Sequence, residues 1–381
     1  MPIGSAMLMQ AGNNLVTMAD GSVWLRTGVL APAASYPLAA QREHLRAHSF
    51  GSISPGGSGA GTVRRVATDG AGRYMIADGD TAYVRMSSDY GATWSNVAHG
   101  MATAATDVAY AGGTWLVVSN TTANLYANAS TNGTSFIGAY TIGTSGGSQF
   151  QADSAQIAHS GTLFYVAIGG SDTANNAWSS PTAASGTWTN RSVSATFGTS
   201  GFGLGAGGGK ALISITGTPT MHRCTDGGSF ASTTAPSSPA TAARPAYIAG
   251  AFIVFFSSSS YFYTTDSVAF AQYSSPTGCA IGYQWALTGG RLVYLATSNS
   301  GISYTADGLT WDYQSTSISA GGALSDGFAM DAQTMIYQPS GSATGYRAAS
   351  SIASSNYVGR SMSTYASGNQ QSNPFLYYRI K

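Results

Sequence analysis

The sequence predicts an all-β protein, a seven-bladed β-propeller with short N- and C-terminal extensions. Three observations lead to this prediction. Aromatic and β-branched residues gather in short clusters between Gly, Ser and Asn, apolar runs recur with a period near forty residues, and a turn motif recurs in phase with the runs. Short strands bounded by turn residues and repeated at such a period are typical of propeller blades.

The composition favours strands over helices or disorder. Among 381 residues, 49 are Gly and only 8% are charged, yet the chain contains 22 Tyr, 14 Phe and 7 Trp. Disordered chains lack so many aromatic residues. Helical proteins are rich in Lys and Glu, of which this chain has only Lys210, Lys381 and Glu43.

Charge and hydropathy limit the classes of function. The net charge is +1 and no basic run exceeds Arg64–Arg65, so we expect no nucleic-acid partner. The N-terminal residues lack the charge pattern of a signal peptide, and no stretch is long enough for membrane insertion. Cys224 and Cys279 either form a disulfide or are two small buried residues, and the sequence leaves both readings open.

Seven apolar runs define the repeat. They start at residues 73, 114, 162, 210, 251, 291 and 334, so the intervals are 41, 48, 48, 41, 40 and 43 residues. A glycine stands directly before each of the first six, and Gln333 stands before the last. A period near forty predicts one blade per run.

A turn motif follows each of the first six runs. The best copy contains Ser87, Asp89, Gly91, Thr93 and Trp94. Gly permits positive φ, and Asp or Asn accepts backbone N–H bonds, so the motif predicts a tight hairpin. The matching residues of the more degenerate copies are Asn132, Gly133 and Phe136; Trp188; Asp226, Gly227 and Phe230; Asp266 and Phe270; and Asp307, Gly308, Thr310 and Trp311.

These turns resemble the Asp-box, or BNR, repeat of sialidases and many other propellers. The copy at residues 87–94 matches the pattern S-x-D-x-G-x-T-W at every fixed position. The resemblance extends from about residue 60 to about residue 350. It implies four-stranded blades with the box between the third and fourth strands. The box residues then have a structural role, since a fold is shared far more widely than any one activity.

Each blade is expected to begin with an apolar strand, such as residues 107–110, that lines the central channel. The Gly-led run is the second and most buried strand, a segment such as 83–86 is the third, and the residues after the turn form the fourth. The seventh repeat lacks a recognisable turn, and residues 349–354 stand in for it. Its closure can borrow a strand from a chain end, but the sequence does not indicate which end.

The predicted domain boundaries are 1–60 for an N-terminal attachment segment, 61–360 for the propeller and 361–381 for a C-terminal tail strand. The first segment contains a hairpin around Asp20-Gly21 and a helix at 38–48, and the last contains a strand at 375–380. Both ends resemble segments of bacteriophage tail-fibre and tail-tip proteins. The resemblance implies attachment to other virion proteins and a homotrimer, and it places the chain in the virion tail after synthesis in the host cytoplasm.

No catalytic set is recognisable. Sialidases use an arginine triad, a Tyr–Glu pair and an Asp, but the only glutamate, Glu43, lies outside the propeller, and the nearest match to an Arg-Ile-Pro motif is residues 63–66. Other glycosidases need two facing carboxylates. The candidates outside the turns are Asp107, Asp153, Asp172, Asp312 and Asp331, and the sequence does not group them.

No metal or cofactor is expected. His44 and His48 lie one turn apart on the predicted helix but lack a third ligand. The glycines of residues 201–209 precede a strand and not a helix, so they predict close packing near the channel instead of a phosphate loop.

The sequence therefore predicts a non-enzymatic phage tail protein that uses its propeller to bind a host-surface glycan or protein receptor. Tyr and Ser, both abundant here, suit recognition of polar surfaces. The alternatives are a sialidase-like hydrolase that processes glycans and a structural decoration protein of the capsid or tail.

Overall fold

The computed structural model describes residues 51–55, 65–147, 149–197, 201–238, 244–257, 260–274, 285–288, 290–295, 301–315, 327–331, 334–339 and 344–349, with five short strands nearer the chain ends. The predicted helix at 38–48, with His44 and His48, lies outside the described residues, as does Cys279.

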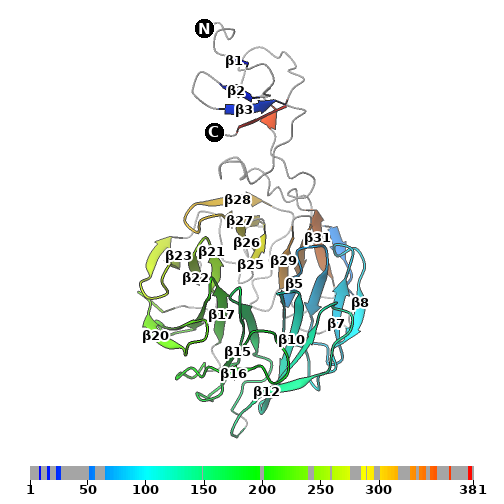
Figure 1. Cartoon of the computed structure of the whole chain (residues 1–381), viewed down its shortest axis with the longest axis vertical. Helices are drawn as coiled ribbons and strands as arrows, with labels where there is room; N and C mark the ends of the chain where they lie inside the picture. Colours follow the sequence, from blue (N-terminus) through cyan, green and yellow to red (C-terminus); the bar gives the residue numbers. More distant parts are fainter. Residues whose placement is uncertain are drawn as a thin grey trace. The chain divides into compact units, whose positions relative to one another are not determined.

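The described residues form seven four-stranded antiparallel sheets arranged as the blades of a β-propeller (Figure 1). The predicted fold class is therefore confirmed. Blades 1 to 3 consist of β5 (Arg65–Thr68), β6 (Tyr74–Ala77), β7 (Tyr83–Ser87) and β8 (Ser95–Ala98); β9 (Asp107–Ala111), β10 (Thr114–Asn120), β11 (Asn124–Ser130) and β12 (Tyr140–Thr144); and β13 (Gln156–His159), β14 (Phe164–Ala167), β15 (Ala177–Ser180) and β16 (Thr189–Asn190).

Blades 4 to 6 follow the same order. They consist of β17 (Phe202–Gly207), β18 (Lys210–Ile215), β19 (Thr220–Thr225) and β20 (Ala231–Thr234); β21 (Ala246–Ile248), β22 (Ala251–Ser257), β23 (Ser260–Thr264) and β24 (Ala271–Ser274); and β25 (Trp285–Thr288), β26 (Arg291–Leu295), β27 (Gly301–Thr305) and β28 (Trp311–Ser315). Each Gly-led run is the second strand of its blade, as predicted, and runs such as β6 and β26 are buried along their whole length.

Blade 7 is built from both ends of the propeller sequence. Its sheet order is β29 (Gly327–Met330), β30 (Thr334–Gln338), β31 (Gly345–Ala349) and β4 (Gly51–Ile53). β4 pairs antiparallel with β31, with Ser52 opposite Tyr346. The N-terminal side of the chain therefore supplies the fourth strand. This topology explains the missing seventh turn, because the third and fourth strands of this blade are not consecutive and no hairpin joins them.

Antiparallel pairing gives the ring two distinct faces. The hairpins between first and second strands and between third and fourth strands emerge on one face, here called the box face. The hairpins between second and third strands and the links between blades emerge on the other, here called the connection face. At most blade boundaries the first strands contact each other around the ring axis, as predicted for the strands nearest the channel, while β21 of blade 5 contacts β26 of blade 6.

Apolar clusters fill the boundaries between consecutive blades. Between blades 1 and 2, for example, Met75 and Val84 pack with Trp115 and Val117, all fully buried. Burial of this kind is the main stabilising contribution in a fold whose strands are individually short. The predicted close packing of residues 201–209 is confirmed: a Cβ added at Gly205 would lie 1.9 Å from the carbonyl oxygen of Pro245 in the next blade.

The chain ends form a compact unit of their own, Met1–Arg46 with Ser351–Lys381, while the propeller unit is Ala47–Ser350. The strands of the end unit make one sheet in the order β1 (Leu8–Met9), β2 (Leu15–Thr17), β3 (Val23–Arg26), β33 (Leu376–Arg379) and β32 (Arg360–Ser361). Two features differ from the predicted division into 1–60, 61–360 and 361–381. β4 belongs to the ring, and the two end segments pair with each other.

Candidate functional site

The predicted box residues lie in the hairpins between third and fourth strands, here called the box turns (residues 87–94, 130–136, 180–188, 225–230, 264–270 and 305–311). In the first, Asp89 accepts hydrogen bonds from the Thr93 backbone nitrogen at 2.8 Å and from its hydroxyl at 2.6 Å. Ser87 accepts one from the Gly91 nitrogen at 2.8 Å. Burial opposes ionisation of Asp89, but the hydrogen bonds from Thr93 and Ser87 outweigh it and lower the pKa of Asp89 to about 2.

Most degenerate copies keep this arrangement. Asn132, Asp266 and Asp307 each accept two backbone N–H bonds within their own turn. Asp226 differs, because its carboxylate accepts from Tyr165 at 2.9 Å and from Ser160 at 2.8 Å, both in the preceding blade. In the turn at 180–188, Thr187 donates to the Ala184 carbonyl at 2.7 Å without an acidic residue.

Each box turn also docks on the preceding blade, which the sequence did not reveal. The turn aromatics pack in the cluster shared with that blade: Trp94, Phe136, Trp188, Phe230, Phe270 and Trp311. Side chains of the preceding blade donate to carbonyls of five turns: Arg347 to Tyr90, Arg73 to Asn132, Tyr140 to Ala183, Arg191 to Gly227 and Lys210 to Thr265. The box turns therefore join neighbouring blades.

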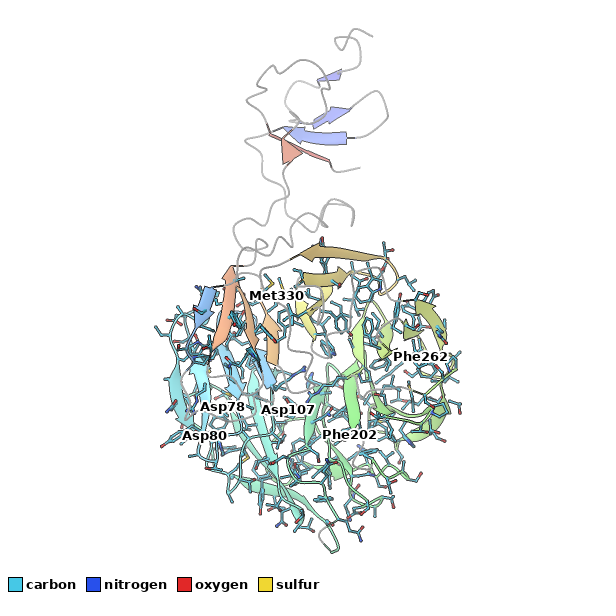
Figure 2. The ribbon with its side chains drawn as sticks, turned by 180° about the vertical axis from the view of Figure 1, so that it is seen from behind. Asp78, Asp80, Asp107, Phe202, Phe262 and Met330 are labelled. Atoms are coloured by element: carbon cyan, nitrogen blue, oxygen red, sulfur yellow. The ribbon has the colours of Figure 1, made fainter. Side chains whose placement is uncertain are left out.

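A polar cluster lies on the ring axis at the connection face and is here called the axial cluster: Arg65, Asp107, Arg244 and Trp285. Arg65, Asp107 and Trp285 begin the first strands of blades 1, 2 and 6, and Arg244 stands two residues before that of blade 5. Figure 2 shows Asp107 near the centre of the ring. Because these blades are not all neighbours, the side chains meet across the axis.

Asp107 contacts both arginines of the axial cluster. Its carboxylate is fully buried and accepts from the Ile157 backbone nitrogen and from Arg244, both at 2.7 Å. The Arg65 guanidinium lies 4.0 Å from the other carboxylate oxygen and 5.6 Å from the ring centre of Trp285. The Trp285 indole donates to the Arg244 carbonyl at 3.1 Å.

Burial and the neighbouring charges both act on the Arg65 guanidinium. Burial and the neighbouring Arg244 cation lower the pKa of Arg65 to about 10, although the Asp107 carboxylate opposes the shift. The Arg65 guanidinium therefore remains charged at neutral pH. The arginine side chains keep exposed fractions of 13% and 10%, so both reach solvent.

A second charged group lies farther from the axis in blade 1 (Figure 2). Arg85 is buried between Asp78 and Asp80, with nitrogen-to-oxygen distances of 2.8 Å to each. Burial raises the pKa of Asp78. His99 accepts from the Met101 nitrogen through Nδ1 at 3.2 Å, and burial lowers the pKa of His99. This group is internally paired and connects blade 1 to the link that follows it.

Of the five carboxylates outside the turns, Asp107 lies against two charged side chains, those of Arg65 and Arg244. Asp172 caps its own turn through the nitrogens of Ala174 and Asn175, and Asp331 accepts from the Thr334 nitrogen. Asp153 stands in a turn with positive φ. The side chain of Asp312 is outside the described part of the chain.

The described residues contain no group of three potential metal ligands. Cys224 is buried and forms no disulfide within them, and the Tyr165 hydroxyl lies 3.4 Å from its sulfur. No helix in that part of the chain is long and apolar enough to cross a membrane.

The sequence pointed to Asp107 as a candidate carboxylate and to residues 63–66 as a candidate motif, but not to Arg244 or Trp285. The usable signal was position: Arg65, Asp107, Gln156 and Trp285 all stand at the start of an apolar first strand. Gln156 follows the same rule, because its side-chain amide bonds the backbone of Phe202 and Leu204 in the next blade.

Comparisons with known proteins agree with this architecture. No protein-family model matches the chain, and no curated protein matches its sequence. Similar solved structures include a streptogramin B lyase, with 12% identity, TM-score 0.57, and coverage of 80% of this chain and 99% of that one. The virginiamycin B lyase of Staphylococcus aureus is 11% identical with a TM-score of 0.58, and the match covers 79% of this chain and 99% of that one. YCF48 bound to D1 peptide is 10% identical with a TM-score of 0.52, and the match covers 80% of this chain and 96% of that one. At these identities the similarity shows the fold, and the chain is a seven-bladed β-propeller.

Proposed function

We propose that this chain is a non-enzymatic recognition protein of a bacteriophage tail. The propeller binds a host-surface glycan or protein receptor, and the end unit attaches the chain to other virion proteins, most simply as a homotrimer. The box turns belong to the Asp-box type and hold the ring together.

The single observation that carries the proposal is the division of the chain into a closed ring and a separate unit made from both termini. A ring closed by β4 and β31 needs no further strand for its own core. The end unit nevertheless has a five-stranded sheet that ends in strands β1 and β32. Sheet edges of this kind are ready partners for another chain.

Two further features support binding over catalysis. The box residues are engaged in hydrogen bonds within the ring, and the described carboxylates outside the turns are engaged in local turns or with the axial arginines. YCF48, which shares the fold, is bound to a peptide in its solved structure.

Electron microscopy of particles that carry this chain tests the proposal, together with binding of the purified chain to a glycan array and to a panel of bacterial cells. We expect the end unit to contact neighbouring virion chains and the propeller to bind cells of the host. Location in the capsid without cell binding would instead indicate a decoration protein. Release of reducing sugar or sialic acid from cell-surface glycans would indicate a hydrolase.

A further inference from the structure

We propose that Tyr273 and the neighbouring box turn of blade 6 (residues 305–311) form a binding site for a neutral sugar ring, here called the rim site. The inference deepens the proposed recognition function. It rests on that proposal for its biological meaning and narrows the receptor to a glycan. The site itself is argued from the boundary between blades 5 and 6.

The first observation is an aromatic ring that faces solvent from a rigid support. The Tyr273 side chain is 40% exposed, and it stands on β24, the outer edge strand of its sheet. Its ring stacks on the buried ring of Tyr261, with 5.7 Å between the ring centres and 21° between the planes. The Trp311 indole in turn donates to the Tyr261 hydroxyl at 3.2 Å. The exposed ring is therefore oriented before a ligand arrives, which lowers the entropic cost of binding.

The second observation comes from the equivalent position in the two preceding blades. Three residues after the turn aromatic, Arg191 of blade 3 donates to the Gly227 carbonyl at 2.9 Å, and Thr233 of blade 4 donates to the Val268 carbonyl at 3.0 Å. Each bond fastens the box turn of the following blade. Tyr273 occupies the same position in blade 5, but its hydroxyl makes no hydrogen bond to another described residue.

The first residue of the apolar run shows the same difference between blades. Arg73 donates from this position to the Asn132 carbonyl at 3.0 Å, and Lys210 donates to the Thr265 carbonyl at 2.9 Å. Blade 5 has Ala251 there, which carries no side-chain donor. Within the described part of the chain, no side chain of blade 5 donates to the carbonyls of residues 306–309. These carbonyls therefore remain open to hydroxyl groups of a ligand.

The exposed ring and the open turn lie side by side. Tyr263 packs edge-on against Tyr273, with 6.2 Å between the ring centres. A Cβ added at Gly308 would lie 3.1 Å from the Tyr263 ring, so the turn rests directly on that ring. Leu309, at the tip of the same turn, is 45% exposed. The rim site therefore combines an aromatic face, a second apolar side chain and backbone acceptors.

This combination matches the two kinds of surface on a sugar. A pyranose ring carries C–H groups on its faces, which pack on an aromatic side chain, and hydroxyl groups on its edge, which donate to carbonyl oxygens. Asp307, the one carboxylate in the turn, is negatively charged at neutral pH and accepts from the nitrogens of Leu309 and Thr310. It repels an acidic sugar, so the rim site favours a neutral one.

The test measures binding of small probes to the full chain by saturation-transfer NMR titration. Methyl β-D-glucopyranoside is the probe, because its hydroxyls are equatorial and both ring faces carry axial C–H groups. Methyl β-D-glucuronide adds a carboxylate, and sorbitol keeps the hydroxyls without the ring. We expect saturation transfer to the ring protons of the glucoside, at least threefold weaker binding of the glucuronide and no detectable binding of sorbitol.

The matched variants are Tyr273→Ala and Tyr83→Ala, since both side chains are 40% exposed and Tyr83 lies in blade 1. We expect Tyr273→Ala to weaken glucoside binding at least fivefold and Tyr83→Ala to leave it unchanged. Tyr273→Phe keeps the ring, should bind within twofold of the wild type and guards against misfolding of the alanine variant. Ala251→Lys supplies the donor that Lys210 provides in blade 4, and should weaken binding at least threefold by occupying a turn carbonyl.

Four outcomes would overturn the rim site: no saturation transfer to the glucoside, equal binding of sorbitol, tighter binding of the glucuronide, or unchanged binding by a folded Tyr273→Ala protein. Equal binding of cyclohexanol would also overturn it and would indicate an apolar protein partner at this surface.

These outcomes are distinguishable from failure of the proposed function. A chain that binds the glucoside through Tyr273 but binds no bacterial cells would retain the rim site and lose the phage-receptor proposal. Cell binding that survives Tyr273→Ala, while glucoside binding is lost, would keep the phage-receptor proposal and exclude the rim site as the receptor site.

Discussion

Blades 1 to 6 and blade 7 are completed in different ways. Each of the first six ends in a local hairpin, whose turn docks on the blade before it. Blade 7 instead takes β4 from the N-terminal side, and only three residue pairs join β4 to β31. The comparison shows that a box turn depends on chain continuity. Where the third and fourth strands are not consecutive, strand pairing replaces the turn.

The boundary between blades 7 and 1 is held both by the pairing of β4 with β31 and by a docked box turn. The Tyr74 hydroxyl of blade 1 donates to the Thr334 carbonyl at 2.7 Å and accepts from the Asp331 nitrogen at 3.1 Å. Arg347 of blade 7 donates to the Tyr90 carbonyl in the first box turn at 2.6 Å. A box turn therefore also joins the last blade to the first, as box turns join consecutive blades elsewhere in the ring.

The largest expected effect comes from removing β4. A chain of residues 61–350 should lose at least about 4 kcal/mol of unfolding free energy or fail to fold, because β31 loses its partner strand. A chain of residues 47–350 keeps β4 and should melt cooperatively. Thermal and urea melts of the two chains check this. Equal stability would mean that β4 is dispensable for closure.

A smaller effect is expected from Trp94→Ala. Trp94 packs with residues of blades 1 and 7, including Ile76 and Ile336, so its removal should cost about 2–4 kcal/mol. Trp311→Ala at the boundary of blades 5 and 6 is the matched control, since its ring occupies the equivalent turn. Urea unfolding measures both. A loss below about 1 kcal/mol for Trp94→Ala alone would show that β4, and not the first box turn, holds the closing joint.

The connection face should be sensitive to mildly acidic pH. Burial lowers the pKa of His99 below its ordinary value of 6.5, so the folded state favours the neutral ring. Stability is then complete above pH 6.5 and decreases as the pH falls below that value. Melting temperatures at pH 7.5 and pH 5 should differ more for the wild type than for His99→Gln. His159 and His222 shift in the same direction and supply the remaining dependence.

The smallest effect is expected from Asp89 in the first box turn, which should respond only to stronger acid. The pKa of Asp89 is lowered to about 2, so its stabilising contribution is present above pH 4 and is lost as the pH falls towards 2. Because Asp89 is partly exposed, we expect a loss of less than about 1 kcal/mol. Asp89→Asn should flatten the stability profile between pH 4 and pH 2. An unchanged profile would contradict the hydrogen-bonding role of the carboxylate, and any ligand binding should be unaffected by this variant.

The repeat allowed the ring of blades to be predicted from the sequence, but the contacts across the ring could not be predicted. Glycine before an apolar run and a turn in phase with it are local signals, and they located the second strands and the box turns correctly. Asp107 and Arg244 are far apart in sequence and come from non-neighbouring blades, so no local pattern could pair them. The hydrogen bond from Tyr165 to Asp226 could not be predicted for the same reason. β4 was missed because Gly51–Ile53 is too short and polar to be recognised as a strand without its partner.

The position of β4 also sets a direction for folding during synthesis. A box turn packs against the blade made just before it, so blades 2 to 6 can each dock as soon as they leave the ribosome. The first box turn is the exception, because its partner blade is made last. β4 emerges before every blade and must wait for β31 with its hydrogen-bonding edge unsatisfied. The ribosome-bound chain is therefore an open arc until residues 345–349 appear, and a chaperone that shields β4 during this interval would raise the yield of closed rings.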